Sequence, residues 1–255
     1  MKKYFVLVLS LFMLVLSSFG QIRTVAEFRQ KKINYYCESN YSKVVNSLDR
    51  ELSLLESHKS EYSEELFLTL KNFLVVDKLY FSLENGKLPK SKKSYFKEII
   101  LTQEEACDDF MKGKSYRQLS GDFLYSLGDL KCQTPFVISV VTAVPRLTKA
   151  KDLYENAVIN SPGLCAAYIS KALWYDYAPG ISGGSHKKAY EIILQAEKNA
   201  RTNSDLFFTF LFKGQILNNL KRYDEAESSL NKAHNLFPNE KITNIIGSGI
   251  QFEED

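Results

Sequence analysis

The chain has 255 residues, in which 33 Lys and Arg face 30 Asp and Glu, and its formal net charge is +3. Only 12 Gly and 6 Pro occur, which excludes collagen-like, low-complexity and turn-dense all-β chains and favours helices. A hydrophobic fraction of 45% is enough to build a core and excludes wholesale disorder. The nearly balanced charge gives no sign of the excess of basic residues that is typical of nucleic-acid-binding proteins.

Residues 1–20 have the parts of an export signal. A basic start at Lys2 and Lys3 precedes an apolar run, and Ser18 and Gly20 fill the positions of a small-x-small cleavage site. The alternative is a membrane anchor, but the run has about 13 residues against the roughly 20 that a spanning helix needs. We therefore expect a cleaved signal peptide and a periplasmic or secreted protein with no stable membrane span. No cysteine directly follows the run, so no lipid anchor is expected.

The N-terminal region reads as helical. Val44, Leu48, Leu52 and Leu55 form one apolar helix face. Leu66, Leu70, Phe73 and Leu74 form another, which ends at a stop signal, Asn85-Gly86. The lysine-rich stretch 87–93 is expected to be a solvated loop. Thr102 to Glu105 resembles a capping box that would start a helix closed by Gly113.

The strongest signal is a helix-pair repeat in segment 207–238. The residues that carry the repeat spacing are small, aromatic or aliphatic and end in a proline: Phe210, Gly214, Leu217, Tyr223, Ala226, Leu230, Ala233 and Pro238. Their spacing resembles the tetratricopeptide repeat, a helix–turn–helix unit of about 34 residues. Small residues allow two antiparallel helices to approach closely, and Pro238 ends the second helix.

The second-helix spacing recurs at Ala150, Tyr154, Ala157 and Pro162, and more loosely from Ala189 onward. The repeat units are expected at 121–160, 165–199 and 207–238, the first two with lengthened inter-helix turns. Segment 136–144, although β-branched, is expected to be a buried helical segment or insertion with Pro135 at a helix start. The expected fold is all-α, with antiparallel helix-pair repeats that form a tetratricopeptide-like right-handed solenoid. Its expected divisions are a signal peptide (1–20), a helical region with a degenerate repeat (21–119), the repeats (120–240) and a tail (241–255).

The resemblance implies a concave groove lined by the first helix of each unit. Its expected lining residues are Asp122, Tyr125, Asp129, Ile169, Leu173, Asp176, Phe208, Leu211, Gln215 and Asn218. A lysine/asparagine clamp for peptide carboxylates is absent from these positions. The resemblance therefore implies a scaffold that binds a protein or peptide partner, with an apolar helix or peptide as the best match.

A narrower resemblance covers segment 177–200, which is similar to the Pro/Gly-Gly turn of exported tetratricopeptide-like proteins. These include the T component of tripartite ATP-independent periplasmic (TRAP) transporters. That resemblance implies a transport accessory that partners a periplasmic solute-binding protein and handles an apolar ligand. This transport-accessory function remains an alternative to the scaffold function.

The same turn contains Gly180-Ile-Ser-Gly-Gly184, which matches the G-x-S-x-G pattern of a hydrolase nucleophile elbow. Such an elbow needs a strand before the serine, whereas the preceding segment reads as a helix. We therefore interpret it as a turn, with Ser185 as the cap of the next helix, and expect no enzyme, cofactor or metal site. An anion contact is expected here from Gly183, Gly184, Ser185 and Lys187.

Four cysteines, at positions 37, 107, 132 and 165, form no Cys-x-x-Cys pair, which argues against zinc ribbons and thioredoxin-type sites. Export permits disulfides, and buried free thiols are the alternative. In the expected repeat register, Cys132 and Cys165 lie roughly 16 Å apart along the helix axis, too far to be bridged. Cys107 and Cys132 are the pair that the register permits.

Overall fold

The computed structural model describes residues 21–240 and 242–243, so the expected signal peptide and nearly all of the expected tail lie outside the described residues. The described part contains ten α-helices, four short 3-10 turns and no β-strand. A lone antiparallel bridge joins Glu84 and Lys87 around the Asn85-Gly86 turn. The all-α prediction is confirmed for these residues.

Four helices form the N-terminal part: α2 (Val25–Cys37), α3 (Tyr41–Ser57), α4 (Glu64–Phe81) and α5 (Lys90–Met111). The predicted apolar faces of α3 and α4 are buried, and Gly113, with a φ of 75°, lies directly beyond the end of α5. Only a residue that tolerates the left-handed region suits such a position, which is why glycine closes this helix.

The C-terminal part is three helix pairs, in which each member packs against its sequence neighbour. The helices are α6 (Gly121–Cys132), α7 (Val140–Asn160), α8 (Cys165–Tyr177), α9 (His186–Asn199), α10 (Asn203–Asn219) and α11 (Tyr223–Leu236). The first two pairs coincide with the predicted units, and the last pair begins four residues earlier than predicted.

Glycine permits the close approach inside two of these pairs. A Cβ atom at Gly128 on α6 would lie 2.5 Å from Cε1 of Tyr154 on α7. A Cβ atom at Gly214 on α10 would lie 2.7 Å from the Leu230 side chain on α11. Both distances are shorter than carbon–carbon van der Waals contact, so a larger residue would push the helices apart.

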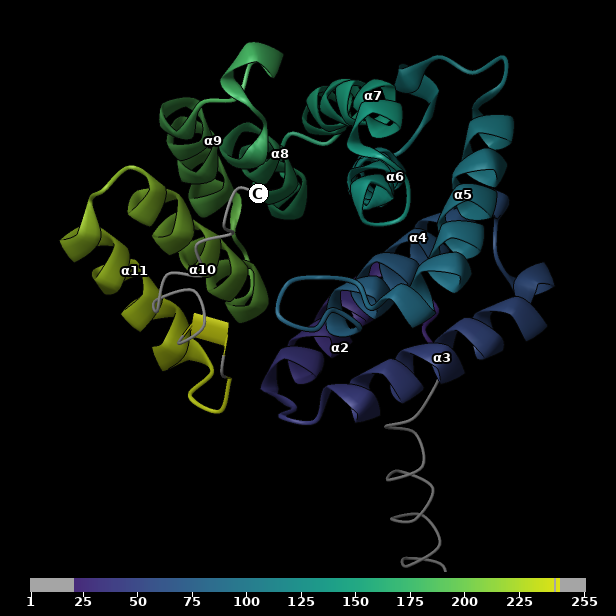
Figure 1. Cartoon of the computed structure of the whole chain (residues 1–255), viewed down its shortest axis with the longest axis horizontal. Helices are drawn as coiled ribbons and strands as arrows, with labels where there is room; N and C mark the ends of the chain where they lie inside the picture. Colours follow the sequence, from purple (N-terminus) through teal and green to yellow (C-terminus); the bar gives the residue numbers. More distant parts are fainter. Residues whose placement is uncertain (1–20, 241, 244–255) are drawn as a thin grey trace, which may run out of the picture.

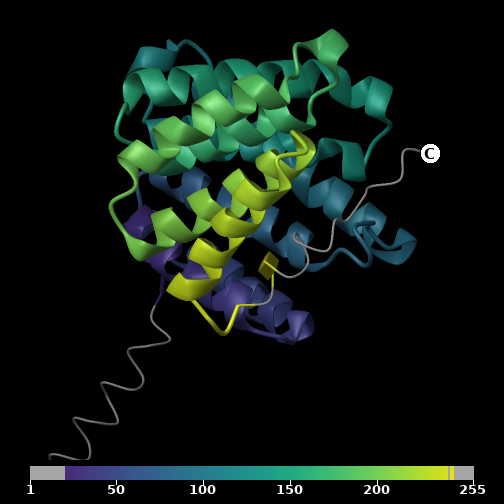
Figure 2. The same cartoon turned by 90° about the vertical axis from the view of Figure 1, so that its left-hand side faces the viewer.

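The helix pairs follow one another around an arc (Figure 1). Helices α4, α6, α8 and α10 form a row in which each contacts the next. Helix α2 contacts both α4 and α10, and so it joins the two ends of the row. Figure 2 shows α11 across the outer side of the C-terminal end.

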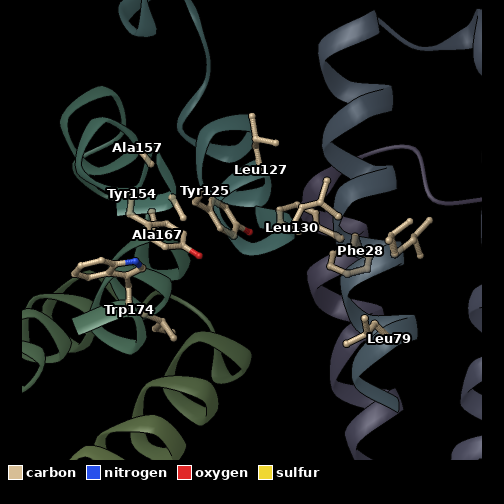
Figure 3. Packing of buried hydrophobic residues seen from close by; sticks show 14 of the residues in the cluster. Phe28, Leu79, Tyr125, Leu127, Leu130, Tyr154, Ala157, Ala167 and Trp174 are labelled. Carbon is tan, nitrogen blue, oxygen red and sulfur yellow. The ribbon is translucent and has the colours of Figure 1, made fainter. Parts of the chain in front are cut away.

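One continuous apolar core runs through both parts of the chain. Figure 3 shows it passing from Phe28 and Leu79, through Tyr125 and Leu130, to Trp174. The Phe28 and Phe73 rings stack with their centroids 5.0 Å apart, which fixes α2 on α4. The predicted repeats therefore share their core with the N-terminal helices.

Three local predictions are wrong. The stretch 87–93 is not all loop, because α5 already begins at Lys90; its lysines lie on the solvent side of the first turns. Thr102 lies in the middle of α5 and starts no helix. Segment 136–144 is helical from Val140, and Pro135 lies in the first turn of the 3-10 helix Thr134–Phe136, as predicted, but the predicted burial is wrong for most of the segment, in which Val141 is 84% exposed.

Candidate functional site

The row formed by α4, α6, α8 and α10 has an inner face, which we define as its side toward α2. This inner face carries Asp77, Asp122, Tyr125, Asp129 and Phe208. The Arg29 guanidinium of α2 forms an ion pair with Asp122 and donates a hydrogen bond of 3.2 Å to the Tyr125 hydroxyl. Three predicted groove residues thus lie together on α6, and α2 contacts two of them. The chain's own helix covers part of the predicted groove.

Helix α2 spans the inner face from α4 to α10. The Lys32 ammonium lies 2.7 Å from Oδ1 of Asp77 on α4 and 5.9 Å from the ring centroid of Phe208 on α10. One turn later, the Tyr36 ring meets Phe208 edge-on, with a centroid distance of 5.1 Å. These contacts hold α2 by charge and by aromatic packing at once.

The sequence analysis missed α2, although a signal for it is present. Thr24 and Glu27 form a capping box, in which the Thr24 hydroxyl accepts from the Glu27 N–H and the Glu27 carboxylate accepts from the Thr24 N–H. The spacing Thr-x-x-Glu is the usual sign of a helix start. This box fixes the beginning of the helix that covers the inner face.

The inner face holds carboxyl groups that are costly to ionise. Burial raises the pKa of Asp129 to about 6, against the opposing effects of a 2.9 Å hydrogen bond from the Tyr154 hydroxyl and the Lys32 charge. Burial also raises the pKa of Asp77, whose side chain is 2% exposed, and Lys32 opposes this rise. Because desolvation penalises the charged form, Asp129 exchanges a proton in the mildly acidic range.

Two buried atoms of this region have no hydrogen-bond partner within the described structure. They are Oδ2 of Asp77 and Nε of Arg29. Buried polar atoms are nearly always paired, so each costs stability where it lies. The charge pairs between α2 and the row thus leave one atom of Asp77 and one atom of Arg29 without a hydrogen bond, which lowers the stability that these pairs contribute.

The remaining predicted groove residues lie at different depths. Ile169 and Leu211 belong to the core, whereas Leu173, Phe208, Gln215 and Asn218 are half-buried. The Asp176 side chain is fully buried and accepts hydrogen bonds from Gln215 and Asn219, while His186 Nδ1 lies 2.8 Å from its Oδ1. Asp176 therefore joins α8, α9 and α10 instead of facing a groove.

Exposed tyrosines border the inner face, and the sequence analysis did not single them out as a group. We call Tyr41, Tyr80 and Tyr177 the tyrosine rim; they are 40%, 41% and 58% exposed. Tyr80 stacks on Tyr36 at 6.0 Å, and the Tyr177 hydroxyl accepts a hydrogen bond of 2.6 Å from Gln215. Rigid aromatic side chains with polar tips are typical of binding surfaces.

The glycine-rich turn is a compact link between α8 and α9. A Cβ atom at Gly184 would overlap the Ala178 carbonyl oxygen, so only glycine fits there. The Ser185 hydroxyl caps α9 by accepting from the Lys188 N–H at 3.2 Å, which confirms the predicted cap.

The turn also uses its own N–H donors. The amides of Gly183, Gly184 and Ser185 each donate to a carbonyl oxygen of the same turn or of α8. The predicted anion contact would need these donors free, so of its four residues only Lys187 offers an exposed polar group without a partner among the described residues. An anion contact at this turn therefore remains a prediction, and the backbone N–H groups would not take part in it.

The geometry around Ser182 differs from that of a nucleophile elbow. Gly180–Ser182 is a single 3-10 turn between two helices, with no strand before it. His234, which the hydrolase interpretation would need, has its Nδ1 3.1 Å from Oε1 of Glu240. Among the described residues, no three His, Cys, Asp or Glu side chains are grouped so as to hold a metal ion.

All four cysteines are free thiols in the structure. Cys107 is buried and donates toward Asn72, with Sγ 3.3 Å from the amide oxygen, and Cys132 accepts from the Tyr154 hydroxyl at 3.4 Å. Burial raises the pKa of both thiols to about 12. The disulfide pairing predicted from the repeat register remains a prediction.

No protein-family model matches the sequence, and no curated protein matches it. Within residues 21–240 and 242–243, no helix is long and apolar enough to cross a membrane.

Proposed function

We propose that this protein is an exported, tetratricopeptide-like scaffold that binds a segment of a partner protein along its inner face and tyrosine rim. The observation that carries the proposal is α2 itself. The row of first helices already accommodates one helix, which it holds through carboxylates on α4 and α6 and through Phe208 on α10.

The contacts of α2 indicate which partner segment would fit. Arg29 and Lys32 supply the charges and Tyr36 supplies the aromatic contact. Because α2 already occupies these carboxylates, a partner helix or peptide with aromatic side chains would match the rings that stay exposed next to α2. Tyr80 on α4 and Tyr177 on α8 remain exposed and are available to contact a partner.

Binding rather than catalysis is the proposed role. The turn around Ser182 links two helices and the buried carboxylates are paired with cations, so the proposal assigns none of them a catalytic step. No cofactor is part of the proposal.

Site-specific photo-crosslinking in the producing cells tests this function. A photoreactive phenylalanine analogue replaces Tyr177 or Tyr80, both on the proposed surface. The matched control carries the same analogue at Ile181, which is 99% exposed but lies in the glycine turn. We expect one discrete partner at the two rim positions and not at Ile181.

The partner's identity separates the two remaining functions. Envelope enzymes or porins would support the scaffold, whereas a periplasmic solute-binding protein would support the transport-accessory alternative. Equal crosslinking at Ile181 and at the rim, or no crosslinked partner at either rim position, would contradict binding on this surface.

A further inference from the structure

Three lysines from three successive helices gather around Tyr175. Lys151 of α7 has its ammonium 5.4 Å from the Trp174 ring centroid and 5.8 Å from that of Tyr175. Lys188 of α9 donates a hydrogen bond of 2.9 Å to the Tyr175 hydroxyl. Lys171 lies one turn before Tyr175 on α8 and feels the charges of both other lysines.

Two of these lysines lack the ion pair that most of the other half-buried or buried lysines form. Lys32, Lys78, Lys131 and Lys213 each lie within 4.0 Å of a carboxylate. Lys151 and Lys171 are also half-buried, yet neither forms an ion pair with any residue that the structure describes; Lys149 is the other such case, and its ammonium lies 4.9 Å from the Tyr116 ring centroid. The protein has therefore placed two ammonium groups under partial cover without a counter-charge in contact.

The Glu155 carboxylate attracts both Lys171 and Lys188, but it forms an ion pair with neither within the described structure. Glu155 accepts the Tyr175 hydroxyl at 3.0 Å, and Glu191 acts on Lys188 from the same helix. Burial lowers the pKa of Lys171 against the attraction of Glu155, and the smaller effects of the Lys188 and Lys151 charges lower it further. Like charges held together under partial cover favour binding of an anion that can contact several of them.

We propose that Lys151, Lys171 and Lys188 form a binding site for a phosphate-type oxyanion beside the glycine-rich turn. A Cβ atom at Gly183 would lie 3.9 Å from the Lys151 ammonium, so this ammonium lies beside the turn. Backbone N–H groups of the turn play no part, because they are already bonded. The oxyanion is either a soluble phosphate group or a phospholipid headgroup, which share this chemistry.

Trp174 provides the readout for a binding test. It is the sole tryptophan of the chain, its Nε1 donates to the Leu147 carbonyl at 3.0 Å, and its ring adjoins Lys151. Sodium phosphate is titrated into the protein at constant ionic strength set with chloride, so that general screening stays fixed. We expect a saturable change in Trp174 fluorescence and, by calorimetry, one site. Vesicles of phosphatidylglycerol form a second arm, with flotation as the assay.

Charge-removing variants locate the site. Lys171→Met and Lys188→Met are expected to weaken phosphate or vesicle binding at least tenfold, measured by calorimetry or flotation. The matched control is Lys198→Met, which removes an exposed lysine from the last turn of α9 and should leave binding unchanged. Bound phosphate should also raise the pKa of Lys171, followed by NMR of labelled lysine.

Each outcome decides the proposal. Saturable phosphate binding that the two variants lose supports a soluble ligand, and vesicle binding alone, lost in the same variants, supports a headgroup. A response to neither probe, or equal binding by Lys198→Met and Lys171→Met, overturns the site. Unchanged circular dichroism of Lys188→Met, whose side chain is exposed, shows that loss of binding is not loss of folding.

Discussion

Replacing Asp129 by Asn tests whether the ionised carboxylate of this half-buried residue lowers the free energy of unfolding. The substitution keeps an oxygen that can accept from the Tyr154 hydroxyl and removes the carboxylate charge. Burial raises the pKa of Asp129 from 3.8 to about 6 in the folded protein. One pKa unit corresponds to about 1.4 kcal/mol, so ionising Asp129 in the folded protein costs up to about 3 kcal/mol, a net cost that already includes the attraction to Lys32. Partial solvation of the side chain reduces the expected gain to about 1–2 kcal/mol.

The sign follows from proton binding. Between pH 3.8 and about 6 the folded protein holds a proton that the unfolded chain releases, so this group's contribution to stability falls as the pH rises. Below that window Asp129 is neutral in both states, and above it the penalty is constant. We therefore expect Asp129→Asn to match the parent protein near pH 4 and to exceed its free energy of unfolding at pH 7.

Urea unfolding followed by circular dichroism at pH 4, 5, 6 and 7 measures this difference. Asp152→Asn, at an exposed position on α7, is the matched control and should show no pH-dependent difference. If Asp129→Asn is instead less stable than the parent at pH 7, the carboxylate stabilises the fold through Lys32 and the desolvation argument is refuted.

Three further predictions concern the helix pairs and the glycine turn. Gly128→Ala should lower the free energy of unfolding by about 1–3 kcal/mol through overpacking, whereas Gly163→Ala, with open space at its Cβ position, should change it little; equal effects in urea would contradict the close contact. Ala226→Leu should cost about 1–3 kcal/mol because Ala226 is buried next to Gly214, and an unchanged urea midpoint would refute this packing. Ser182→Ala should leave any measured esterase activity intact, and loss of such activity would restore the hydrolase interpretation.

The helix pairs of the C-terminal half were predictable because their packing leaves a local trace. Gly128, Gly214 and Ala226 recur at helical spacing next to large residues, and this pattern depends on only two neighbouring helices. The loop predicted at 87–93 and the helix start predicted at Thr102 were wrong because these local signals do not depend on helix packing. Charge composition and a four-residue motif are compatible with a solvated helix as well as with a loop or a helix start.

The inner face was only partly predictable. The repeat spacing placed Asp122, Tyr125 and Asp129 together on one helix, as the structure does. Arg29, which contacts Asp122 and Tyr125, lies 93 residues before Asp122 in the sequence, and no sequence period connects the two. Burial of Leu211 likewise depends on neighbours that the pattern of one helix does not reveal.

The bridge that α2 makes between α4 and α10 has a consequence for how the protein unfolds. In an open array of repeats each unit contacts only its neighbours, so the terminal units can fray independently. Here Tyr36 and Phe208, separated by 172 positions in the sequence, are packed together, and the first described helix secures the last pair. Loss of either end thus exposes the core of the other, so the described chain should melt in one cooperative step. The same long-range closure must form late and should slow folding relative to an open array of equal length.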